Sequence, residues 1–91
     1  MKIFVKASTA RKVWHIDFYG MIGDLIPIQS IYILVNGDKE SARKAAQRYA
    51  AHFGYNVNKI MVQDAYRDEE WFNSQPQESD RAGMFRYVPA S

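Results

Sequence analysis

Hydrophobic and polar positions alternate along residues 13–20, which read VWHIDFYG. The apolar positions are Trp14, Ile16 and Phe18, and the polar positions between them are His15 and Asp17. A period of two is typical of a strand with one buried face, and we interpret the polar side as an exposed cross-strand face. Residues 1–7 (MKIFVKA) alternate in the same way, so we expect the two segments to form an antiparallel hairpin.

Three further strands and a short helix follow from the same pattern. Residues 28–37 (IQSIYILVNG) form the most hydrophobic stretch and predict a central strand. Residues 57–66 predict the next strand, and residues 84–91 predict an edge strand that Pro89 ends. Between them, residues 67–75 predict a short helix, which its acidic first turn favours.

The main helix is predicted over residues 39–53. Asp38 is a suitable N-cap, and Gly54 is suited to the left-handed residue that ends a helix. One side carries small and aromatic residues at helical spacing, which is the stripe of a helix that packs on a sheet. These residues are Ala42, Ala45, Ala46, Tyr49, Ala50 and Phe53.

The segment GMIGDLIP, residues 20–27, predicts a loop but is unusually apolar. Met21, Ile22, Leu25 and Ile26 either fold back on the core or stay exposed as a contact patch. We expect them to fold back, because large apolar patches are uncommon on monomeric proteins.

The order βββαβ(α)β predicts the α+β class. We expect a small two-layer domain with a mostly antiparallel sheet of four to five strands and one main helix. The 91 residues are short enough for one domain, 1–91. The chain has no cysteine, no apolar run long enough for a signal peptide and none near the ~20 residues of a spanning helix. We therefore expect a soluble, cytoplasmic protein.

Known catalytic and metal-binding patterns are missing from the sequence. His15 and His52 lack the spacing to other donors that a zinc site requires. The serines lack the context of an activated hydroxyl, and no phosphate-binding glycine pattern occurs. We therefore expect no catalytic residues, no metal, no cofactor and no enzymatic activity.

Charge is unevenly distributed along the chain. The net charge is +2, but residues 1–63 carry +5 and residues 64–91 carry −3. Four cations of the predicted main helix are candidate partner-binding residues: Lys39, Arg43, Lys44 and Arg48. Glu40 is expected to pair with Lys44 four residues on, whereas neither arginine has an acid at that spacing. The pattern therefore fits either a solvated helix back or a surface for phosphates and carboxylates.

The acidic segment that follows supplies the other candidates, Asp68, Glu69, Glu70 and Trp71. Trp71 and Phe72 are adjacent, so they cannot both face inward on one helix. We interpret Trp71 either as a core anchor or as a surface anchor, a role in which tryptophan is frequent at interfaces.

The stretch ILVNGDKESARKAAQRYAAHFGYNVNKIMV, with short opening strands and a polar tail, resembles small phage-encoded anti-CRISPR proteins. In particular it resembles inhibitors of type I CRISPR-Cas surveillance complexes. The resemblance implies a stoichiometric inhibitor that binds the RNA-guided complex, contacting protein subunits or guide RNA, and blocks target DNA. The alternatives are a small nucleic-acid-binding module and a non-enzymatic interaction subunit of phage or host.

Overall fold

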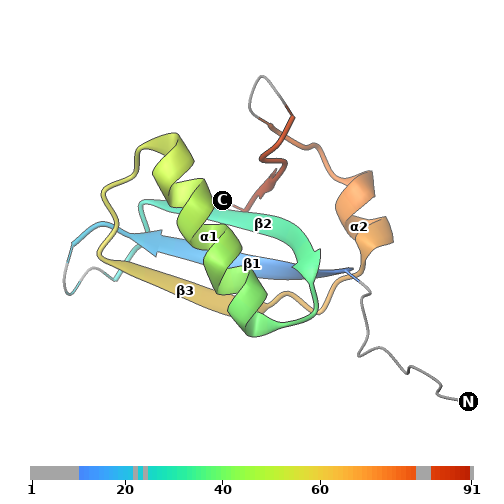
Figure 1. Ribbon diagram of the computed structural model, residues 1–91, viewed down its shortest axis with the longest axis horizontal. Coiled ribbons are helices and arrows are strands. Elements are labelled where there is room, and N and C mark those ends of the chain that lie inside the picture. Colours follow the sequence, from blue (N-terminus) through green and yellow to red (C-terminus); the bar gives the residue numbers. More distant parts are fainter. Residues whose placement is uncertain (1–10, 22, 24, 80–82, 91) are drawn as a thin grey trace, which may run out of the picture.

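The computed structural model describes residues 11–21, 23, 25–79 and 83–90. Its elements are β1 (Arg11–Tyr19), β2 (Gln29–Asn36), α1 (Lys39–Phe53), β3 (Lys59–Asp64), α2 (Glu69–Ser74) and β4 (Val88–Pro89). The strands form one antiparallel sheet in the order β3-β1-β2-β4, and α1 lies across one of its faces (Figure 1). The predicted α+β class, with a mostly antiparallel sheet and one main helix, is confirmed.

Strand β1 is an inner strand with a neighbour on each edge. β2 pairs with β1 from Arg11 to Phe18, and β3 pairs with it from Trp14 to Tyr19. The expected hairpin between residues 1–7 and β1 is therefore wrong, because the two neighbours of β1 are β2 and β3. The strand expected at residues 1–7 itself lies outside the described residues. Alternation indicates which face of a strand is buried, but it does not indicate which segment lies alongside.

Helix α1 has the bounds and both caps that the sequence predicts. The Asp38 carboxylate accepts a hydrogen bond from the Glu40 backbone N–H at 3.3 Å. Gly54 ends the helix with a φ of 74°, a conformation that costs little only in glycine. The buried residues of α1 pack on the face of the sheet formed by alternate strand residues. This core contains Ala42, Ala46, Tyr49 and Ala50 from α1, and Trp14, Ile16, Phe18, Ile31, Ile33 and Val62 from the sheet.

The opposite face of the sheet has a smaller core, to which α2 contributes. Phe72 of α2 is buried there with Val13 of β1 and Val88 of β4. Tyr32 and Trp71 pack against the same cluster. The two helices therefore lie on opposite faces of one sheet.

The expected fold-back of the apolar loop is wrong for the side chains that the structure describes. Leu25 is 93% exposed, Ile26 is 79% exposed and Met21 is 71% exposed. The loop connects β1 to β2 in an antiparallel hairpin, and at its base the Ile28 N–H donates a hydrogen bond to Phe18 O. The core under α1 is formed by other residues.

The expectation that the polar side chains of β1 are exposed is wrong for Asp17. This carboxylate is buried, accepts a hydrogen bond from the Ser30 hydroxyl, and lies 3.6 Å from His15 Nδ1. His15 also contacts the Tyr32 ring, with centroids 5.2 Å apart. The two polar residues are thus part of the packing between β1 and β2.

The last strand is shorter than the predicted segment 84–91, because regular pairing is limited to Val88–Pro89. These residues pair with Tyr32 and Ile31 of β2, which makes β4 an edge strand that ends at Pro89, as predicted. Helices α1 and α2 of the described chain are both too short and too polar to cross a membrane.

Candidate binding surface

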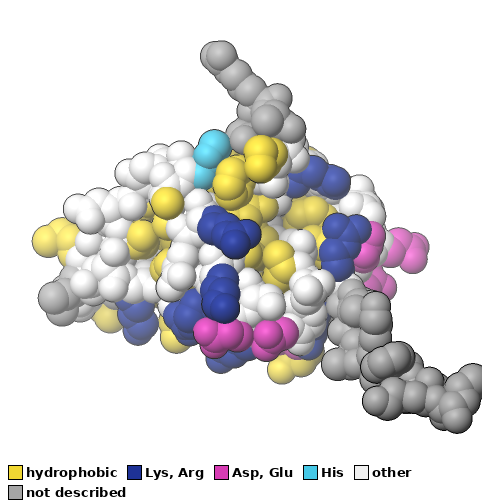
Figure 2. Space-filling model, viewed as in Figure 1, with side chains coloured by type: hydrophobic (Ala, Val, Ile, Leu, Met, Phe, Trp, Pro, Cys, Tyr) yellow, Lys and Arg dark blue, Asp and Glu magenta, His cyan; other side chains and the backbone are white. Residues whose placement is uncertain are grey.

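The cations of α1 lie on the outer side of the helix and along its two flanks. Lys39, Lys44 and Arg48 are exposed, and Arg43 is half-buried. Figure 2 shows Lys and Arg side chains gathered over α1, with acidic side chains near its first turn. Within the described residues none of the four takes part in an ion pair. The expected pair between Glu40 and Lys44 is therefore wrong: both side chains extend into solvent, where such a pair gains little.

Lys44 and Arg48 share one groove on the β2 side of α1. This groove, which we call the Lys44 groove, has a volume of 330 Å³ and is also lined by Val35, Asn36 and Ser41. Its described lining contains no carboxylate. Two cations one helical turn apart, in a groove whose described lining has no carboxylate, attract phosphate or carboxylate groups from a partner.

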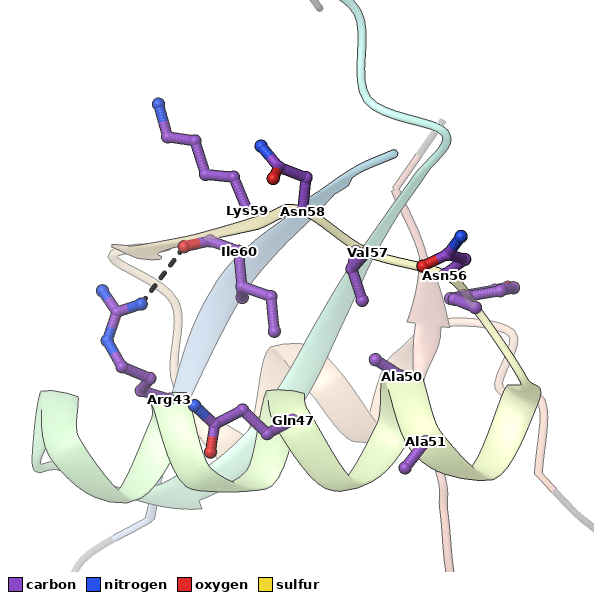
Figure 3. A pocket seen from close by; sticks show the side chains of 10 residues that line it. Arg43, Gln47, Ala50, Ala51, Asn56, Val57, Asn58, Lys59 and Ile60 are labelled. Atoms are coloured by element: carbon purple, nitrogen blue, oxygen red, sulfur yellow. Dashed lines mark hydrogen bonds between the residues drawn. The ribbon is translucent and has the colours of Figure 1, made fainter. Parts of the chain in front are cut away.

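Arg43 lies on the other flank of α1, which faces β3. Its guanidinium donates a hydrogen bond to the Ile60 carbonyl at 3.2 Å. It lines a groove of 670 Å³, which we call the Arg43 groove and which lies between α1 and residues 55–60. In Figure 3 the Val57 and Ile60 side chains point toward α1, and the side chain of Lys59 points away from it. The amine of Lys59 lies instead over the Tyr19 ring, 5.7 Å from its centroid.

Lys39 lines a third groove, of 540 Å³, near the end of β3. This Lys39 groove also contains Trp14, Asp64 and Tyr66. Asp64 is paired with Lys12 at 2.5 Å and accepts from the Tyr66 backbone N–H at 2.7 Å. The hydrogen bond from Lys12 and, to a smaller extent, the hydrogen bond from the Tyr66 N–H hold the pKa of Asp64 below its ordinary value of 3.8.

The acidic candidates lie at α2, on the opposite face of the sheet from α1. Asp68 caps α2 by accepting from the Trp71 N–H at 2.8 Å, and Glu69 pairs with Arg11 at 2.9 Å. Glu70 is exposed. Trp71 is half-buried: its ring packs against Tyr32 with centroids 5.0 Å apart and lies under the Arg67 guanidinium. The structure thus brings the acidic residues together but separates them from the basic ones.

The backbone of β3 is the part of this surface that sequence reasoning missed. The alternation of residues 57–66 predicts a strand, and nothing in it indicates that the strand lies at an edge beside α1. Arg43 could have been associated with that strand only if the neighbours of β3 were already known, because its acceptor is a main-chain carbonyl. Such an acceptor has no signature in the amino-acid sequence.

Among the described residues, no three His, Asp or Glu side chains are placed to hold one metal ion. Comparison with protein-family models, with curated proteins and with solved structures finds no significant match to this chain.

Proposed function

We propose that this chain is a non-enzymatic binding protein that docks on a nucleoprotein through the outer side of α1. The observation that carries the proposal is the exposure of Lys44 and Arg48 without an acidic partner in the described structure. Their solvated charges are available to phosphates, and a rigid helix that is capped at both ends holds them in place.

The resemblance to anti-CRISPR proteins leads to a more specific form of the proposal. In that form the nucleoprotein is a type I CRISPR surveillance complex in the host cytoplasm, and docking blocks target DNA. The cations of α1 contact guide-RNA phosphates or acidic subunit surfaces. The acidic residues at α2, Glu70 above all, face basic residues of the same complex from the other side of the protein.

A DNA-binding assay tests the specific form. A purified type I surveillance complex is mixed with increasing amounts of the protein before labelled target DNA is added, and the bound DNA is measured by mobility shift. The proposal predicts that bound DNA falls to zero at a fixed molar ratio. Full DNA binding in a large molar excess of the protein, with several type I complexes, would rule out this form.

The broader form is tested separately with nucleic acid alone. A direct nucleic-acid binder makes many phosphate contacts and loses affinity steeply as salt rises. We expect weak binding of free RNA and DNA in moderate salt, and capture of a nucleoprotein from a phage-host lysate. Tight binding of free RNA by the isolated protein would instead favour the nucleic-acid-binding module.

A further inference from the structure

No strand among the described residues pairs with the outer edge of β3. The Ala65 N–H donates to Val13 O at 3.2 Å, which makes these two residues a hydrogen-bonded pair of the β1–β3 ladder. In an antiparallel ladder such pairs alternate with pairs whose backbone groups point outward. The N–H and C=O of Ile60, Val62 and Asp64 therefore point away from β1, toward the outer edge of the sheet.

These outward groups are mostly unused. The Ile60 carbonyl accepts its hydrogen bond from Arg43. Within the described chain, no hydrogen bond is made by the outward backbone groups of Val62 or Asp64. An edge of this kind is a template on which another extended chain can pair.

Two grooves follow the same edge on the side that faces α1. The Arg43 groove lies at the Ile60 end of β3, and the Lys39 groove lies at the Asp64 end. The side chains of Ile60 and Val62 face α1, since both pack in the core beneath it. A strand that paired with β3 would thus place every second side chain in one of these grooves.

The charge of the two grooves determines which kind of strand can bind at the β3 edge. Arg43 and Lys39 supply cations, and the one carboxylate among the described residues that line the two grooves is Asp64, which Lys12 already neutralises. Acidic side chains on the incoming strand are therefore favoured. A second copy of this chain is disfavoured, because antiparallel pairing of two β3 edges would bring Arg43 and Lys39 of both copies together.

We infer that the β3 edge binds an extended, acidic segment of a partner protein as an added strand, with alternate carboxylates directed toward Arg43 and Lys39. Main-chain hydrogen bonds to Val62 and Asp64 supply the affinity, and the grooves supply the preference for acidic side chains. This site is separate from Lys44 and Arg48, so it does not rest on the proposed function.

The probe is a blocked octapeptide of alternating valine and glutamate, added to the intact protein. Binding is followed by the chemical shifts of backbone amides and by titration calorimetry. We expect saturable binding, with the largest shifts at the amides of Ile60, Val62 and Asp64. Absence of saturable binding, or shifts centred on α2 or β4, would overturn the inference.

N-methylation of the probe separates strand pairing from simple charge attraction. When the added strand runs antiparallel to β3, the residues that donate to β3 stand directly opposite Ile60, Val62 and Asp64, so their side chains share the α1 face. These donors are the glutamates. Methylating the glutamate nitrogens should weaken binding at least about tenfold, while methylating the valine nitrogens should leave it nearly unchanged. Equal affinities for the two methylated peptides would contradict strand addition.

Protein variants complete the test. Arg43→Gln should weaken binding of the unmethylated probe about fivefold, because the guanidinium charge is lost. The matched control is Arg67→Gln, which also removes one exposed guanidinium but lies beside Trp71 of α2, and it should leave the peptide affinity nearly unchanged. Unchanged binding by Arg43→Gln would refute the predicted role of this groove. The outcome is independent of whether a nucleoprotein binds α1.

Discussion

At the scale of single residues, side chains of the same charge differ in the partners they contact. Arg43 is tied to a main-chain carbonyl, whereas Arg48, one turn and a residue later on the same helix, is free of ion pairs with any described residue. Asp64 is neutralised by Lys12, whereas Glu70 is solvated. Charge counting alone could not have separated these cases, because each partner is distant in the sequence.

The ion pair of Asp64 makes a pH-dependent contribution to stability. The pKa of this carboxyl is lowered on folding, so its contribution is complete above 3.8 and is lost as pH falls through the lower, folded value. Asp64→Asn should cost up to about 1 kcal/mol at pH 7. Urea unfolding at a series of pH values should show the gap between wild type and variant closing below pH 3.8. A gap that stays constant down to pH 2 would show that the charge of Asp64 is not involved.

Tyr49 links α1 to residues 85–87. Its ring contacts Phe53, Phe85 and Tyr87, and its hydroxyl donates to the Arg86 carbonyl. Tyr49→Ala should lower the free energy of unfolding by roughly 3 kcal/mol. Tyr49→Phe keeps the ring and should cost only about 1 kcal/mol, from the lost hydrogen bond. Similar losses for the two variants in denaturant unfolding would mean that the hydroxyl, and not the ring, stabilises this region.

At the scale of elements, the sequence was most informative where the determinants are local. Helix α1 could be placed from Asp38, Gly54 and the spacing of its alanines, all of which lie within or beside the helix. The neighbours of β1 could not, because strand pairing depends on contacts between distant segments. For the same reason only part of the candidate site could be predicted. The sequence indicates the cations of α1, but it does not indicate that the edge of β3 lies beside them.

The caps of α1 allow a test at this scale. Asp38→Ala removes the acceptor for the Glu40 N–H and should destabilise the protein by about 1 kcal/mol. Gly54→Ala places a Cβ at a φ of 74° and should also cost about 1 kcal/mol, although no atom blocks the new methyl group. Thermal unfolding checks both, with Ala51→Ser, an exposed position on the same helix, as the control. Caps that cost no more than this control would show that α1 is held by packing alone.

At the scale of the whole molecule, the candidate residues are divided between two faces. Helix α1 with its four cations and helix α2 with the acidic candidates pack on opposite sides of one sheet, so a partner that contacts both must surround part of the protein (Figure 1). A straight nucleic acid duplex can contact only one of these two faces at a time. If both helices bind as proposed, the partner is a large assembly with a cavity or cleft and not a single strand of RNA or DNA.

The most direct test of the central claim compares two charge-reversed proteins that have the same net charge. The first carries Lys44→Glu and Arg48→Glu on α1, and the second carries Lys59→Glu and Arg67→Glu, two exposed cations that lie outside the Lys44 groove. Circular dichroism first establishes that both are folded, and the affinity of each for a captured nucleoprotein is then measured by surface plasmon resonance. Docking through α1 predicts that the α1 variant loses binding by at least about a hundredfold, or 2.7 kcal/mol, while the second variant stays within about threefold of wild type. Equal affinities of the two variants would contradict docking through α1.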